Sequence, residues 1–179
     1  NAQIFIRGVP EDYDGWAAEG NDEWSFAELL PYFCKIEADP DLKDSFHGTS
    51  GPIRIRRFQY DEFHPEHKAF YDACRATGYP DCPDHDNPNS TGVGPLALNN
   101  PDGIRWSTAI GYLSQARHRP NLTIKANSHV HRVLFKGRHA IGVEVDCDGE
   151  TDNIYGGETI LCGGAIGSPQ LLMLSGIGP

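Results

Sequence analysis

Eight histidines and five cysteines are among the side chains of this 179-residue chain that could bind a metal or transfer a proton. Two short groups have the spacing of metal ligands, His64-Pro-Glu-His67 and Cys82-Pro-Asp-His85. A zinc site takes about four nitrogen or sulfur ligands that converge on one ion, and neither group contains four such side chains. Positions on the surface or in turns explain these residues more simply. The sequence therefore predicts no metal site.

Three arginines, at positions 54, 56 and 57, form a cluster of positive charge. They could bind an anionic substrate or a phosphate. The alternation of Ile53 and Ile55 with arginine is also typical of a half-buried strand, in which case the arginines form its exposed face. The chain contains no G-x-S-x-G motif and no recognisable triad order, so the sequence gives acyl transfer no support.

The last stretch of the chain, residues 158–179, has the most ordered pattern. Thr159–Cys162 is a short apolar run closed by two glycines, Gly163 and Gly164, which predicts a buried strand entering a turn. Ser168 is the predicted N-cap of a short helix with Pro169 at its first position. In open α/β sheets such a turn lies where nucleotide cofactors bind. An ordinary strand–helix connection has the same pattern.

The remaining elements follow from apolar periodicity and from capping and breaking residues. In the first half we expect a short strand at 4–6, an acidic loop at 10–22, a helix from 26 with Ser25 and Glu28 as its capping box, a kink or second helix after Pro31, a loop at 39–51, and a strand around 53–55. In the second half we expect a helix from 65 to Gly78, a long loop at 79–101, a helix at 107–117, and strands at 122–126, 129–135 and 140–145.

Several of these segments resemble one known family. The closing stretch, Gly164-Ala-Ile-Gly-Ser-Pro-Gln-Leu-Leu-Met-Leu-Ser-Gly-Ile-Gly-Pro179, closely resembles the second signature of the glucose–methanol–choline (GMC) flavin oxidoreductases. The opening stretch, Asn1-Ala-Gln-Ile-Phe-Ile-Arg-Gly8, is similar to the segment that follows the family's glycine- and serine-rich flavin loop. Stretches 24–33, 46–52 and 119–122 fall in the family's order. The resemblance spans the chain, with one departure: Gly167 stands where the family usually has asparagine.

The resemblance implies FAD as the cofactor and indicates which residues contact it. The predicted cofactor-binding residues are Asn1, Ala2, Gln3, Ile4, Val130 and Gly163. The first four match the segment that runs under the flavin, although a chain end is also a place where residues fray. Val130 matches a position whose backbone pairs with the adenine edge, which is compatible with a packed strand residue. None of the eight histidines matches the family's catalytic base, so no catalytic residue is predicted.

The fold class implied is mixed α/β (α+β). It would comprise part of an FAD-binding doubly wound domain and part of an antiparallel-sheet substrate domain. Residues 1–7 and 121–179 are assigned to the FAD-binding domain, the latter with a β-meander and the strand–turn–helix unit, and residues 8–120 to a substrate-side or lid segment. The family's G-x-G-x-x-G fingerprint is expected before Asn1 and its base histidine after Pro179, so the chain resembles a middle segment of the family.

The activity implied is oxidation of an alcohol CH–OH group, with transfer of a hydride to N5 of FAD after a histidine removes the hydroxyl proton. Choline-dehydrogenase-like enzymes are the most similar members. Two alternatives remain open from the sequence. The chain by itself could be a catalytically silent fragment or an interaction module, because it lacks the fingerprint and the base. Some relatives on this scaffold are hydroxynitrile lyases.

Composition limits the partners. The formal charge of −10 opposes binding to nucleic acid or to an anionic membrane surface. No apolar run is long enough to span a membrane. Five widely spaced cysteines without a C-x-x-C pair favour a reduced, cytoplasmic setting. The expected partners are thus a small-molecule alcohol and, because the sheet is expected to need further strands, other chains of the same protein or a homo-oligomer.

Overall fold

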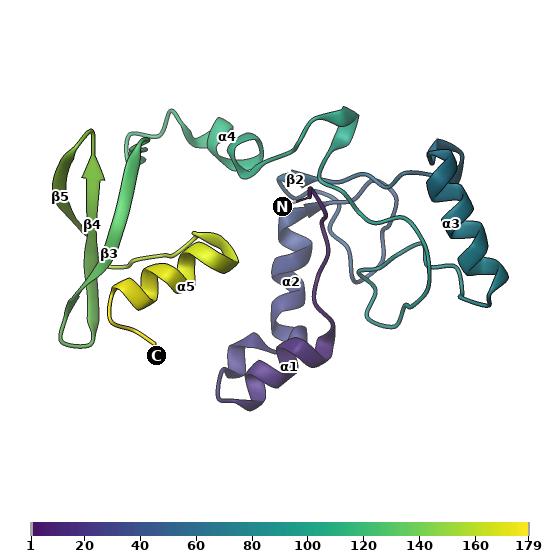
Figure 1. Cartoon of the computed structure of the whole chain (residues 1–179), viewed down its shortest axis with the longest axis horizontal. Helices are drawn as coiled ribbons and strands as arrows, with labels where there is room; N and C mark the ends of the chain where they lie inside the picture. The colour runs from purple at the N-terminus through teal and green to yellow at the C-terminus, as the bar shows by residue number, and fades with distance from the viewer. Residues whose placement is uncertain (1, 179) are drawn as a thin grey trace. The chain divides into compact units, whose positions relative to one another are not determined.

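The computed structural model describes residues 2–178 and divides the chain into two compact units, with the boundary along the chain between Arg119 and Pro120 (Figure 1). The assignment of residues 1–7, 8–120 and 121–179 to an FAD-binding domain and a substrate-side segment stays a prediction.

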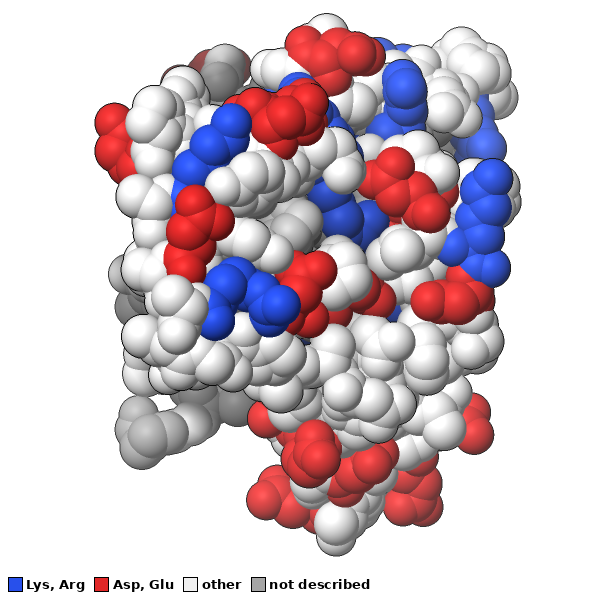
Figure 2. Space-filling model, turned by 90° about the vertical axis from the view of Figure 1, so that its right-hand side faces the viewer, with Lys and Arg blue, Asp and Glu red and all other residues white. Residues whose placement is uncertain are grey.

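The first unit begins with two helices, α1 (Pro10–Ala18) and α2 (Phe26–Ile36). The prediction of a loop over 10–22 was wrong for α1, because Pro10 is suited to a first helical position and Glu11 and Asp12 favour the positive end of the helix. The 3₁₀ turn η1 (Asp22–Trp24) follows α1. Stretch 10–24 contains no Lys or Arg, and Figure 2 shows acidic side chains gathered in the lower part of the view.

Helix α2 confirms its predicted start. The Ser25 hydroxyl accepts a hydrogen bond from the Glu28 backbone N–H at 3.3 Å. The helix continues through Pro31 as one element, where we expected a kink or a second helix. Proline at this position removes only the hydrogen bond to the Ala27 carbonyl. Tyr13 of α1 packs its ring 5.5 Å from that of Phe33, which holds the two helices together.

A small parallel pair of strands, β1 (Glu37–Ala38) and β2 (Ile53–Arg54), follows α2. Ile53 and Ile55 are buried and Arg54 is exposed, so the predicted alternation is confirmed. The predicted strand at 4–6 is reduced to an isolated bridge between Ile4 and Leu98, because its neighbours form no continuous ladder.

Helix α3 (Pro65–Ala76) confirms the predicted helix, with Pro65 at its first position and Gly78 beyond its end. The 3₁₀ turn η2 (Tyr60–Glu62) precedes it. The long stretch 79–101 is irregular up to the 3₁₀ turn η3 (Pro101–Gly103), as predicted. It is nevertheless partly buried, through Cys82, Asp84, Asp86 and Ala97.

The predicted helix at 107–117 is present in a different geometry. It consists of a wide π-helical stretch, η4 (Ala109–Leu113), followed by the short α4 (Ser114–Ala116). Gly111 is buried, and a Cβ there would lie 2.7 Å from the Pro52 carbonyl oxygen. The backbone of η4 therefore packs directly against the segment that enters β2.

The second unit is a three-stranded antiparallel sheet in the order β3 (Ser128–Lys136), β4 (His139–Cys147), β5 (Glu150–Tyr155). Two of the predicted strands are confirmed. The one at 122–126 is absent, and β5 was not predicted, because all its side chains are exposed and leave no apolar periodicity to detect. Val133 and Val145 are buried on the sheet.

Helix α5 (Gly164–Leu174) packs on β3, where the Ser175 hydroxyl accepts a hydrogen bond from the Val133 N–H at 2.8 Å. The predicted helix start was wrong: α5 begins five residues before Pro169. Ser168 lies inside it and accepts from the Gly163 N–H at 3.0 Å. The predicted strand Thr159–Cys162 is also absent, because no described strand lies beside it to complete a ladder.

Candidate functional site

In the second unit, a hollow of about 510 Å³ brings together two of the predicted cofactor residues, Val130 and Gly163. Its walls come from three sources: strand β3 and its neighbours, the irregular segment 156–162, and Leu171 of α5. A Cβ at Gly163 would lie 3.1 Å from backbone atoms of Gly167 and Ser168. Glycine at this position therefore allows the chain to turn tightly into α5.

The chemistry of this hollow fits a nucleotide. Val130, Val143, Ile160 and Leu171 provide apolar side chains against which a planar base can pack. Helix α5 begins at the rim, and the N–H groups of a helix N-terminus favour an anion such as a phosphate. Thr159–Leu161 makes no hydrogen bond to another backbone group of the described residues, so its N–H and C=O groups are available to partners.

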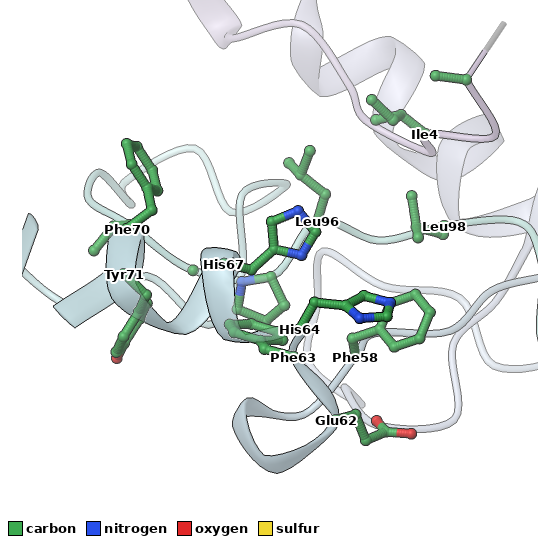
Figure 3. A pocket seen from close by; sticks show the side chains of 14 residues that line it. Ile4, Phe58, Glu62, Phe63, His64, His67, Phe70, Tyr71, Leu96 and Leu98 are labelled. Atoms are coloured by element: carbon green, nitrogen blue, oxygen red, sulfur yellow. The ribbon is translucent and has the colours of Figure 1, made fainter. Parts of the chain in front are cut away.

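In the first unit, a larger hollow of about 660 Å³ lies beside the other predicted cofactor residues (Figure 3). Ala2 and Ile4 line it. Gln3 adopts a positive φ of 65°. Its carbonyl accepts from the Asn99 N–H at 2.8 Å, and its side-chain oxygen accepts from the Asn100 amide at 3.2 Å. Asn1 lies outside the described residues.

Sequence reasoning missed the rest of this larger hollow. Its lining residues are Ala2, Ile4, Phe58, Glu62, Phe63, His64, His67, Phe70, Tyr71, Val93, Gly94, Pro95, Leu96 and Leu98. His64 and His67, which the sequence places on the surface or in a turn, are exposed side chains at this hollow with their rings 6.0 Å apart. The only sequence feature that could have indicated this hollow was the apolar spacing of α3, and that spacing predicted a helix face packed against the core.

Glu62 is the one carboxylate among the residues that line this hollow, and it is already paired. It accepts from the Gln59 N–H at 2.8 Å and from the Arg56 guanidinium at 2.5 Å. The Gln59 hydrogen bond and then the Arg56 contact lower the pKa of the Glu62 carboxyl. These contacts favour the ionised form of the Glu62 carboxyl, and the positive charge of Arg56 balances it.

The first unit also contains a buried cluster of charged side chains. Its members are Arg7, Glu37, Asp39, His47, Arg57 and Asp84. For Arg57, both interpretations of the arginine cluster are wrong, because its side chain is only 4% exposed and pairs with Asp39 at 2.6 Å. It therefore neither lies on an exposed strand face nor is free to bind an anion. A buried charge needs such a partner.

His47 is central to this cluster. Nδ1 lies 3.2 Å from Glu37 and 3.3 Å from Asp39, and Nε2 lies 3.0 Å from Asp84. Burial lowers the pKa of His47, but the hydrogen bonds with Asp84 and Glu37 outweigh it, so that the pKa is raised.

The cluster also contains a possible metal-ligand group, because Glu37, Asp39 and His47 have ligand atoms within 4.8 Å of one another. Arginines already occupy the two carboxylates, since Arg7 pairs with Glu37 at 2.6 Å and Arg57 with Asp39. Arg7, Arg57 and His47 thus contact the carboxylates of Glu37, Asp39 and Asp84, and these contacts tie together segments that are distant in the sequence.

Comparison with known proteins decides the family. The family model described as GMC oxidoreductase matches residues 1–179. This chain belongs to the GMC oxidoreductase family. It is 41% identical over 179 residues to an uncharacterised GMC-type oxidoreductase of Rhodococcus erythropolis, covering 100% of this chain and 36% of that protein. It is 42% identical over 179 residues to mitochondrial choline dehydrogenase of Homo sapiens, covering 99% and 30%.

Solved structures of GMC relatives have the same fold. Pyridoxine 4-oxidase from Mesorbium loti aligns with a TM-score of 0.88 and 38% identity, over 100% of this chain and 35% of that one. An FAD-dependent oxidoreductase from Chaetomium thermophilum aligns with a TM-score of 0.84 and 31% identity, over 100% and 33%. The predicted mixed fold class and the choline-dehydrogenase-like similarity are thus confirmed.

This GMC chain spans about a third of the length of the relatives that it matches. Within residues 2–178, no helix is long and apolar enough to cross a membrane. All five cysteines of the GMC chain are free.

Proposed function

We propose that this chain is part of an FAD-dependent oxidoreductase that oxidises an alcohol CH–OH group, with N5 of the flavin as the hydride acceptor. The observation that carries the proposal is the match of the whole chain to the GMC family. Two hollows support it, because each is lined by residues that the family resemblance assigns to the cofactor. The protein's task is to bind, orient and shield the reactants.

We assign the hollow beside Gly163 to the nucleotide part of FAD. The backbone N–H and C=O of Val130 would pair with the adenine edge, and the apolar walls would enclose the ring. The N-terminus of α5 supplies positive potential for a phosphate. This assignment explains why a strand residue, a glycine turn and a helix start share one hollow.

We assign Asn1, Ala2, Gln3 and Ile4 to the segment under the flavin ring. The hydrogen bonds from Asn99 and Asn100 hold Gln3 in its positive-φ conformation. Such a conformation is costly for a residue with a side chain, and it presents the backbone of this segment in one fixed orientation. The adjacent hollow then offers space for a substrate beside the flavin.

The chain by itself is proposed to be inactive. None of its histidines matches the family's catalytic base, and Thr159–Leu161 lacks the neighbours that a buried strand requires. Further strands and the base would come from other segments of the protein. We also propose a cytoplasmic setting, because the five cysteines are unpaired.

The test is to purify the flavin-loaded protein that contains this chain and to add alcohols in the absence of oxygen. Loss of the visible flavin absorbance, with one aldehyde or ketone formed per flavin, would support alcohol oxidation. Persistence of the absorbance while a cyanohydrin releases cyanide and aldehyde would support the lyase instead. A protein that binds no flavin under any condition would exclude both.

A further inference from the structure

We propose that the hollow between Ala2–Ile4 and α3 binds the apolar part of a neutral alcohol, either an aromatic ring or an alkyl chain of about six carbons, in preference to a quaternary ammonium alcohol. This inference rests on the proposed function, because it identifies the substrate class of the same enzyme. The hollow is the space beside the segment assigned to the flavin.

The size and walls of this hollow suit an apolar ligand. Its volume of about 660 Å³ lies within the usual range for small-molecule sites. Figure 3 shows the ring of Phe70 on α3, the rings of Phe58 and Phe63 below, and Ile4, Leu96 and Leu98 on the facing segments. Most of the lining side chains carry no polar atom.

Two of these apolar side chains are left exposed. Phe70 is 67% exposed and Ile4 is 44% exposed. A ligand that covers them removes apolar surface from water, which stabilises binding in proportion to the area covered. A small, strongly hydrated ligand cannot use that area.

The charges of the hollow do not suit a cation. Glu62 is its only carboxylate, and Arg56 and the Gln59 N–H already hold that group. Recognition of quaternary ammonium by aromatic rings needs open ring faces. The face of Phe58 is already covered by the Arg56 guanidinium at 4.2 Å, and this fixed cation beside the hollow repels a second one.

An anionic ligand has no counter-charge either, because no Lys or Arg is among the lining residues. The imidazoles of His64 and His67 remain as polar groups that can exchange hydrogen bonds with a neutral hydroxyl. A neutral ligand with an apolar body is therefore the class that the walls favour.

Binding can be measured without turnover on the intact protein that contains this chain. We would titrate the ¹⁵N-labelled protein, in the absence of oxygen, with 1-hexanol, benzyl alcohol and choline and follow the amide signals of Tyr71, Val93 and Gly94. The two neutral alcohols are expected to shift these signals at concentrations at which choline does not. Shifts caused by choline at lower concentration than by 1-hexanol would overturn the inference. This result does not depend on whether the protein binds flavin.

Turnover gives a second readout. In the flavin-loaded protein, kcat/KM for straight-chain primary alcohols is expected to rise about fourfold for each added CH₂ from propanol to hexanol, and to exceed that for choline. A flat series, or choline as the best substrate, would overturn the inference. If no alcohol is oxidised, the proposed function fails, and the titration alone decides the ligand class.

Three variants sharpen the test. Phe70→Ala is expected to lower kcat/KM for 1-hexanol about tenfold and to leave the value for choline unchanged. Tyr32→Ala is the matched control, because Tyr32 is 63% exposed on α2 and does not line the hollow. Arg56→Gln leaves Glu62 without its guanidinium partner and is expected to improve choline relative to 1-hexanol. Unchanged hexanol kinetics in a folded Phe70→Ala protein would contradict the inference.

Discussion

At the scale of single residues, the buried cluster around His47 is the feature that sequence reasoning did not find. The sequence shows acids, arginines and one histidine scattered between positions 7 and 84, and nothing in their spacing places them together. Folding brings them within 2.6 to 3.8 Å of one another. Predicting Arg57 as exposed failed because it was grouped with Arg54 and Arg56, although a period of two places it on the same face as the buried Ile53 and Ile55.

The raised pKa of His47 leads us to expect that stability depends on pH. Its pKa is raised above its ordinary value of 6.5 by Asp84 and Glu37, in opposition to burial. The folded protein therefore holds the proton more tightly than the unfolded chain, and the stabilisation is fully present below pH 6.5 and is lost as pH rises through the folded pKa. We expect the free energy of unfolding, measured by urea denaturation, to fall above pH 6.5. In His47→Gln this part of the pH dependence should disappear; an unchanged pH profile in that variant would refute the assignment.

Removing the charge of Arg57 is expected to cause a large loss of stability. Arg57→Met leaves Asp39 buried without its guanidinium partner, which is expected to lower the free energy of unfolding by about 3–5 kcal/mol. Arg132→Met is the control, because Arg132 forms an exposed pair with Glu144 whose loss should change little. Equal effects of the two substitutions on urea denaturation would show that Arg57 is not the buried partner described here.

At the scale of elements, local signals predicted the helices with clear caps and the strands with clear alternation. Ser25 with Glu28, Pro65, and the valines of β4 are examples. Helix α1 was missed because its proline and glycine were given more weight than its acidic first turn. Strand β5 carries no apolar period. Segment 159–162 has the apolar run of a buried strand, but a strand exists only when a neighbour pairs with it.

Two glycines in helical segments should respond in opposite ways to alanine. Gly111→Ala places a Cβ 2.7 Å from the Pro52 carbonyl and is expected to lower the free energy of unfolding by about 1–3 kcal/mol. Gly15→Ala in α1 meets no atom within 4 Å and should raise it by up to about 1 kcal/mol. Thermal melts of both variants provide the measurement. A neutral Gly111→Ala would mean that η4 does not pack on the entry to β2.

At the scale of the whole molecule, the second unit leaves large apolar side chains in water. Ile160 is 81% exposed and Ile166 is 84% exposed, and both flank the Gly163 turn. The sequence pattern predicted a buried strand at Thr159–Cys162, whereas the structure leaves this stretch without a strand and Ile160 exposed. The pattern could not indicate which segments would bury that strand, because the chain spans about a third of its relatives.

This exposure predicts self-association of the isolated chain. In light scattering at rising concentration, we expect a mass above the 19.7 kDa of one chain. The double substitution Ile160→Ser with Ile166→Ser should reduce it. A single, cooperatively melting monomer at all concentrations would contradict the account of this surface.

The most direct test of the central claim is hydrogen–deuterium exchange of the intact protein with and without FAD. If the hollow beside Gly163 and the segment at Ala2–Ile4 contact the cofactor as proposed, FAD slows amide exchange in peptides that contain residues 2–6, 129–131 and 160–166. The exposed turn at Asp148-Gly149 should be unaffected. Protection confined to other peptides, with these three unchanged, would contradict the claim that this chain contacts the flavin nucleotide.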